Sequence, residues 1–177
     1  MTLIDVTKLN PLKTYVASEI GSSLISKVIQ FGSHKIYPQY KPEEIASHTF
    51  ALRCVNGVWH VWENHLKWNG IREYTLKEYE QNERTSDVVK VIVNEYPLSL
   101  TTMDYLLLYN PGYSALEDFA IAGERLIGLQ LPETKGWVCS QSVAACNLQI
   151  CVDIKKPFDE ITPIDWQVYL EKRKETK

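Results

Sequence analysis

One dipeptide, Asn56-Gly57, constrains the fold of this chain more than any other feature. It separates two runs in which apolar and polar residues alternate, residues 48–55 and 58–65. Asn and Gly best tolerate the two positive φ angles of a type I′ turn, the connection that fits the twist of a two-stranded hairpin. The sequence therefore predicts an antiparallel β-hairpin over residues 48–65.

The same turn predicts which residues face one another. With two residues in the turn, Val55 lies opposite Val58 and His48 opposite His65. Because side chains alternate between the two faces of a strand, His48, Glu63 and His65 are expected on one face, at the open end of the hairpin. His48 and Glu63 are then diagonal neighbours, about 7–8 Å apart and within reach of a contact. This face is the more apolar at its centre, so we expect it to be the buried one.

The composition is that of one domain over residues 1–177, with a core over residues 14–170. The chain is 45% hydrophobic and 23% charged, which excludes a disordered chain. Nineteen Lys and Arg against 22 Asp and Glu leave a net charge of −3, without the basic stripe that nucleic-acid binding requires. No apolar run approaches the roughly 20 residues of a membrane span, and Met1–Pro11 lacks the apolar stretch of a secretory signal. We therefore expect a cytoplasmic protein with no nucleic-acid partner and no membrane span.

The chain has four cysteines, Cys54, Cys139, Cys146 and Cys151. In a reducing compartment we expect them to be thiols. None forms a CxxC pair, and no Cys/His spacing resembles a zinc site, so no metal or other cofactor is expected. Three of the four, Cys54, Cys146 and Cys151, are interpreted as packing residues.

Further elements are predicted from apolar spacing and from turn residues. In chain order they are a helix over Gly21–Phe31, a loop over Lys35–Lys41, a strand over Val88–Val93, a helix capped by Thr101 or Thr102 that runs through Tyr105–Tyr109, a helix over Ser114–Leu126 and a loop over Leu131–Gly136. Val143, Cys146 and Ile150 then indicate a buried helix that opens at or beside Cys139. Thr162-Pro163 is typical of a helix start, with Thr as N-cap and Pro as the first helical residue.

Cys139 is the candidate nucleophile. It stands at the start of a predicted helix, where the partial positive charge of the helix end stabilises a thiolate, the reactive form of cysteine. Backbone N–H groups at the same end can receive the oxyanion that forms when a thiolate attacks a carbonyl. The alternative is that Cys139 is a small apolar residue at the start of a core helix, because buried free cysteines are common.

A nucleophilic cysteine needs a base, and a histidine base needs an acceptor that orients its ring. His48 and Glu63 in the hairpin supply such a pair. His65, opposite His48, is a competing base or orienting group. The alternative interpretation is that these residues are a polar pair at a strand end, facing solvent.

Five short segments, in this order, resemble one family. They are residues 21–31, Ser47-His48-Thr49-Phe50, Val61-Trp62-Glu63-Asn64, Cys139-Ser140-Gln141 and Thr162-Pro163-Ile164-Asp165. The ordered set resembles the YiiX/YebB-like branch of the circularly permuted NlpC-type, papain-like cysteine hydrolases, and it covers residues 21–166. Those proteins have a Ser-His on one strand, an acid ending the paired strand and a Cys-Ser-Glu opening a later helix. Gln141 and Asn64 depart from this pattern, because the family often has Glu at the first position and usually a small residue at the second.

The resemblance implies a permuted papain-like fold of the α+β class, an antiparallel sheet packed against helices, in which the base precedes the nucleophile. It implies Cys139 as the nucleophile, His48 as the general base and Glu63 as the orienting acceptor. The substrate is then a peptide, an amide or an acyl ester. The residues expected to bind it are Ser47, Trp62 and His65. Two alternatives stay open: an acyltransferase that uses the same thioester, and a non-catalytic binding domain on the same fold.

Three tryptophans, Trp59, Trp62 and Trp68, stand close together in the sequence. We interpret them as core residues and as walls of an aromatic groove beside the site, rather than as a surface on which nucleic-acid bases stack. This interpretation predicts that Trp62 and Trp68 lie near Cys139.

Overall fold

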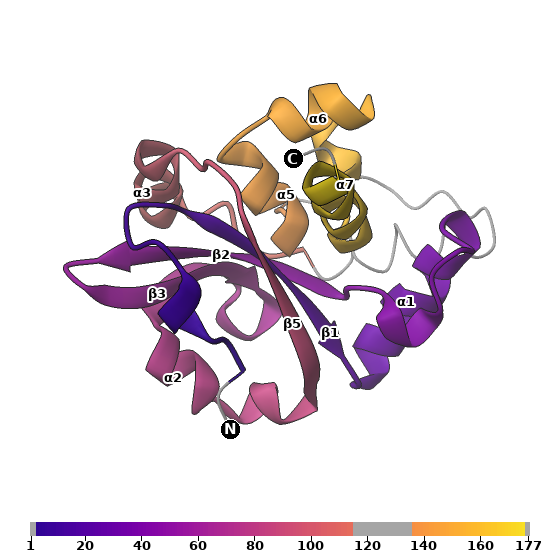
Figure 1. The fold of residues 1–177 in the computed structure, drawn as a ribbon, viewed down its shortest axis with the longest axis horizontal. Coiled ribbons are helices and arrows are strands. Elements are labelled where there is room, and N and C mark those ends of the chain that lie inside the picture. The colour runs from indigo at the N-terminus through magenta and orange to yellow at the C-terminus, as the bar shows by residue number, and fades with distance from the viewer. Residues whose placement is uncertain (1–2, 115–135, 176–177) are drawn as a thin grey trace.

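A computed structural model describes residues 3–114 and 136–175 of the chain. Within them, one sheet has the strand order β4-β3-β2-β1-β5, and every neighbouring pair is antiparallel (Figure 1). The strands are β1 (Tyr15–Gly21), β2 (His48–Val55), β3 (Val58–His65), β4 (Gly70–Thr75) and β5 (Val88–Glu95). The structure therefore has an antiparallel sheet with helices and belongs to the α+β class.

The helices pack around this sheet. They are α1 (Leu24–Ile36), α2 (Leu76–Glu80), α3 (Leu100–Tyr109), α5 (Cys139–Ala145), α6 (Gln149–Ile154) and α7 (Pro163–Glu175). Short 3₁₀ turns lie at Val6–Lys8, Pro42–Glu44, Leu66–Trp68, Glu83–Asp87 and Phe158–Glu160. Within the described residues, no helix combines the length and the apolar character that crossing a bilayer requires.

Most of the predicted elements are present, with shifted ends. The strand predicted over Val88–Val93 is β5, and the helix predicted through Tyr105–Tyr109 is α3, whose N-cap is Ser99 instead of Thr101 or Thr102. Helix α1 continues to Ile36, so it takes the first two residues of the loop that was predicted over 35–41. The helix predicted over 114–126 and the loop predicted over 131–136 lie almost wholly outside the described residues.

The hairpin has the predicted turn and register. Asn56 and Gly57 have φ angles of 51° and 80°, and Val55 pairs with Val58. The ladder between β2 and β3 runs as far as Ala51 opposite Trp62. The predicted strand pairing of His48 with His65 lies beyond that ladder, although the two rings lie 5.3 Å apart between centroids.

Both faces of the sheet are buried, so the prediction of a single buried face is wrong. One face carries the residues predicted to be inside, and it packs against α2 and the N-terminal segment in a cluster that includes Ile4, Phe50, Leu52, Val61 and Tyr79. The opposite face packs against α3, α5 and α7 in a second cluster that includes Ala51, Trp62, Met103, Val143 and Trp166. The second layer of helices covers a face that the hairpin pattern alone would leave in solvent.

Gly57→Ala is expected to lower the free energy of unfolding by about 1–2 kcal/mol, because a residue with a Cβ atom is strained at positive φ. A methyl group there meets no other atom within 4 Å, so the cost is conformational. Urea unfolding measures the change. As the control, Asn56→Gly keeps a residue that adopts positive φ and should change stability by less than about 0.5 kcal/mol. Equal losses in the two variants would contradict this turn geometry.

Candidate active site

The centre of the site is His48, the first residue of β2. Its imidazole Nε2 lies 2.7 Å from a carboxylate oxygen of Glu63 on β3. Both side chains are buried, Glu63 completely. Because a carboxylate only accepts hydrogen bonds, Nε2 carries the proton of this bond. Nδ1 is then the ring nitrogen left for the Cys139 thiol, with which His48 shares a hydrogen bond and an electrostatic attraction. The predicted triad therefore meets at one place.

The surroundings of His48 favour its protonated form. Burial alone would lower its pKa, but the negative charge and hydrogen bond of the Cys139 thiolate, followed by the hydrogen bond and charge of Glu63, raise the pKa to about 10. A buried imidazolium between two acidic partners is stabilised by opposite charge. The surroundings of His48 thus favour its imidazolium form.

Tyr74 on β4 holds the other side of Glu63. Its hydroxyl donates to the second carboxylate oxygen, so both oxygens of Glu63 have a donor. Tyr74 was not predicted from the sequence. Its place follows from the register of β3 and β4, in which Tyr74 pairs with Val61. The connection between these strands is a 3₁₀ turn and not a two-residue turn, so the hairpin rule did not give that register.

Cys139 is the first residue of α5, and 2% of its surface is exposed. Gln141 holds this helix start: its side-chain oxygen accepts from the backbone N–H of Val138, and its side-chain nitrogen donates to the backbone carbonyl of Asp159. A glutamate at this position would accept the first bond but not donate the second. The amide therefore suits both partners.

Ser140, the residue after Cys139, is held by residues that come later in the chain. The Ser140 hydroxyl donates to the carbonyl of Ile161 at 2.7 Å. The Trp166 indole N–H donates to the carbonyl of Ser140 at 3.1 Å. Helix α7 and the segment before it therefore fix the start of α5 on the sheet.

Asn64 connects the hairpin to the segment that contains Cys139. Its buried amide nitrogen donates to the carbonyl of Trp137 at 2.9 Å, to the hydroxyl of Ser142 at 2.8 Å and to the carbonyl of Gly112 at 3.3 Å. Trp137 and Ser142 lie on either side of Cys139 in sequence. Asn64 thus positions the segment that contains Cys139, a role that a small residue at this place cannot fill.

The three residues expected to bind substrate have different surroundings. The His65 ring lies edge-on to His48 and 6.3 Å from the Tyr113 ring, and its Nδ1 accepts from the backbone N–H of Lys67. The Ser47 hydroxyl accepts from the backbone N–H of Gly21 and donates to a carbonyl of β1, so it joins the ends of β1 and β2.

Trp62 does not line a groove, and that prediction is wrong. The side chain is completely buried, and its indole N–H donates to the carbonyl of Met103 on α3. Trp62 belongs to the core beneath α3 and α5 because those helices cover its face of the sheet. Trp68 is half-buried and packs against Tyr74, Lys67 and Arg72.

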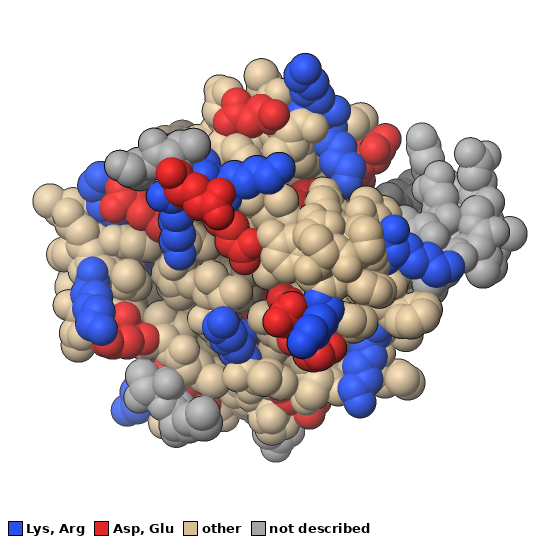
Figure 2. All heavy atoms as spheres, turned by 45° about the vertical axis from the view of Figure 1, so that its right-hand side comes forward, with Lys and Arg blue, Asp and Glu red and all other residues tan. Residues whose placement is uncertain are grey.

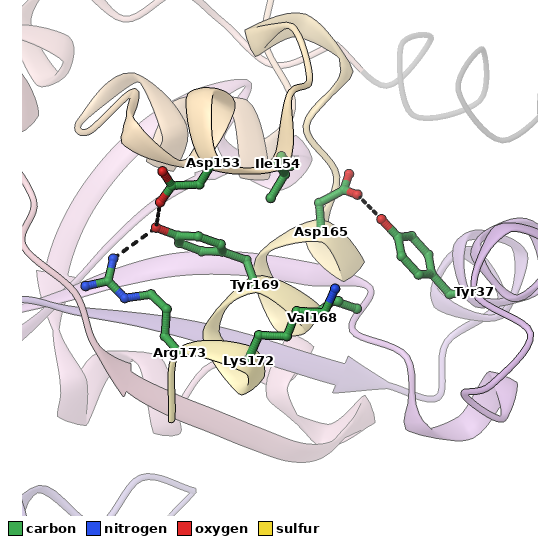
Figure 3. A pocket seen from close by; sticks show the side chains of 8 residues that line it. All are labelled: Tyr37, Asp153, Ile154, Asp165, Val168, Tyr169, Lys172 and Arg173. Atoms are coloured by element: carbon green, nitrogen blue, oxygen red, sulfur yellow. Dashed lines mark hydrogen bonds between the residues drawn. The ribbon is translucent and has the colours of Figure 1, made fainter. Parts of the chain in front are cut away.

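The Thr-Pro-x-Asp segment has a structural role at the start of α7. Asp165 accepts from the backbone N–H and the hydroxyl of Thr162, from the Lys156 ammonium and from the Tyr37 hydroxyl. Burial would raise the pKa of Asp165, but Lys156 and these hydrogen bonds hold it below its ordinary value. The bond from Tyr37 ties α1 to α7 across a cavity of about 500 Å³ between α1, α6 and α7 (Figure 3). None of the triad residues lines this cavity.

The remaining cysteines, Cys54, Cys146 and Cys151, are free thiols. Cys146 is buried, and burial raises its pKa to about 12. Cys54 and Cys151 are half-buried. Within residues 3–114 and 136–175, no three side chains of the metal-binding types gather at one place.

Comparison with known proteins leaves the family open. No protein-family model matches the chain, and no curated protein is significantly similar to it. The resemblance to the permuted papain-like hydrolases therefore stays a prediction from the sequence, beside the geometry described above.

Asn64→Asp is expected to lower the free energy of unfolding by about 2–4 kcal/mol, because a buried carboxylate would replace the donor that three oxygens share. Urea unfolding measures this loss. Asn147→Asp is the control, since the Asn147 amide donates to one carbonyl at the surface and its loss should be under about 1 kcal/mol. Similar small losses in both variants would show that Asn64 does not hold the α5 segment.

Proposed function

We propose that this protein is a cysteine hydrolase that cleaves a peptide, amide or acyl-ester bond through a thioester on Cys139. The observation that carries the proposal is the position of His48, whose ring lies between the Cys139 thiol and the Glu63 carboxylate. A nucleophile, a base and a group that orients the base are the parts of a papain-like triad. A permuted papain-like fold is part of the same proposal, because the strand of the base precedes the helix of the nucleophile.

In the first half of the reaction, the Cys139 thiolate attacks the substrate carbonyl carbon and forms a C–S bond. Negative charge moves to the carbonyl oxygen, where backbone N–H groups at the start of α5 are placed to receive it, since the first N–H groups of a helix have no acceptor within the helix. When the oxyanion collapses, the bond to the leaving nitrogen or oxygen breaks. His48 gives its Nδ1 proton to that leaving atom.

In the second half, the neutral His48 ring takes a proton from water. The water oxygen attacks the thioester carbonyl, the C–S bond breaks, and the acid product leaves. The thiolate and the imidazolium are then restored. Glu63 holds the same ring nitrogen throughout, so the ring keeps Nδ1 toward the sulfur and the substrate in both halves.

The first test is alkylation of each cysteine by iodoacetamide, read by mass spectrometry. At about pH 6 an ordinary thiol is almost unreactive, whereas a thiolate paired with an imidazolium still reacts. Cys139 is expected to react at this pH faster than the half-buried Cys54. His48→Ala should lower that rate at least about tenfold, because the cationic partner is lost. Incubation with p-nitrophenyl acetate should then leave an acetyl group on Cys139 in the wild type only.

The proposal is contradicted if Cys139 reacts no faster than Cys54 or if the reactivity of Cys139 survives His48→Ala. It is also contradicted if the acetyl group forms equally on another cysteine. His60→Ala is the matched control, because His60 is a histidine of the same hairpin that pairs with Glu73 and not with the triad.

Glu63→Gln tests the orienting carboxylate through the pKa of His48. Because Glu63 raises that pKa, removing its charge should lower it by about one to three pH units. The imidazolium would then be lost at lower pH than in the wild type. NMR titration of the His48 ring measures the change. In Glu73→Gln, which removes a carboxylate paired with Arg53, the pKa of His48 should stay the same. An unchanged pKa in Glu63→Gln would contradict the assigned role.

A further inference from the structure

Helix α1 exposes the apolar side that its amphipathic pattern predicts to be buried. Leu24, Val28 and Phe31 recur at the spacing of one helix face, yet Leu24 is 79% exposed and Phe31 56% exposed. Ile25 and Ile36 are exposed beside them. The residues of α1 that are buried are small or polar, namely Gln30, Gly32 and Ser33.

The inward side of α1 is fixed by hydrogen bonds and not by apolar packing. The Gln30 side chain donates to the carbonyl of Gly21 at the end of β1 and to the carbonyl of Ile45 just before β2. The Ser26 hydroxyl lies so close to Gly21 that a Cβ atom there would clash with it. These contacts hold the polar side of the helix against the sheet, so its apolar side faces outward.

The charge on α1 narrows the choice of partner. The helix contains Lys27 and Lys35 and no acidic residue. The acidic turn Pro42–Glu44 lies on the Gln30 side of the helix, away from the apolar stripe, because Gln30 bonds to the adjoining Ile45. Elsewhere, on the face that Figure 2 shows, acidic and basic side chains are interspersed. A helix with an exposed apolar stripe, in which all charged residues are basic, is complementary to an anionic surface.

We propose that α1 docks on an anionic lipid bilayer, with Leu24, Ile25 and Phe31 inserted among the lipids and the lysines at the headgroups. Interfacial helices combine an apolar face that enters the headgroup boundary with Lys or Arg at its margin. A second copy of the chain fits less well, because a symmetric contact through α1 brings lysines of both copies together with no acidic partner on the helix. This docking is independent of the chemistry at Cys139.

Docking of α1 would bring a defined part of the protein to the membrane. The helix begins just after β1, whose Glu19 pairs with His48 on β2. Gly21, at the end of β1, also contacts Ser47, the residue before His48. The surface that would meet the lipid therefore adjoins the end of the sheet where the site lies.

The test is flotation of the full chain with vesicles of phosphatidylcholine alone or with about one-third phosphatidylglycerol, at low salt. The wild type is expected to float with the anionic vesicles. Leu24→Ser/Phe31→Ser should reduce the floating fraction at least about tenfold, because two inserted apolar groups are lost. Lys27→Glu should reduce it by about tenfold, the effect of about 1 kcal/mol per basic residue near an anionic surface.

Matched controls separate docking from general surface effects. Leu12→Ser/Leu108→Ser removes two apolar side chains outside α1 that are more exposed than Leu24 and Phe31, and Lys77→Glu reverses an exposed charge on α2. Both should float like the wild type, and thermal unfolding should show that every variant is folded. The proposal is overturned if the wild type does not float, or if the controls lose flotation as much as the α1 variants. It is also overturned if sedimentation shows that the wild type is a dimer and that Leu24→Ser/Phe31→Ser is a monomer, because α1 would then hold two copies together. Alkylation of Cys139 should be unchanged in the α1 variants, so failure here is distinct from failure of the proposed hydrolase activity.

Discussion

The contact between His48 and Glu63 is the interaction on which the site depends. Two neighbouring strands place a histidine and a carboxylate on one face, and the carboxylate binds Nε2 of the ring. This single bond decides which ring nitrogen faces the thiol, because an imidazole has two nitrogens and the carboxylate takes one. It also places a negative charge where it favours a cationic ring. The tautomer and the orientation of the His48 ring thus have one common cause, and Glu63 adds to the effect of Cys139 on the charge of the ring.

How far the sequence predicts the structure depends on how far apart in the sequence the interacting residues lie. The hairpin was predictable because its turn is local, and the register of a two-residue turn placed His48 and Glu63 on one face without any other information. The start of α5 was predictable to within one residue. Tyr74 was not predictable, because its place depends on a strand pairing that no short turn sets. The burial of Trp62 also was not predictable, since it depends on helices that come later in the chain and cover its face of the sheet.

Helix α1 illustrates the limit of apolar periodicity. The spacing of Leu24, Val28 and Phe31 correctly indicated a helix, but it did not indicate which side packs on the sheet. The buried Gln30 amide holds that orientation, because it donates to two backbone carbonyls at the ends of β1 and of the segment before β2. Leaving a buried carbonyl without a donor costs about 1–3 kcal/mol. Periodicity carries no information about such backbone partners.

The bonds from the last part of the chain to Ser140 have a consequence for the order of synthesis. Ser140 is held by Ile161 and Trp166, which lie close to the end of the sequence. On the ribosome, the hairpin that carries the base is complete long before these residues emerge from the exit tunnel. The thiol of a nascent chain therefore has its histidine available but lacks the helix that seats it beside the ring. The start of α5 therefore reaches its final position beside His48 only after residues 161–166 have been made.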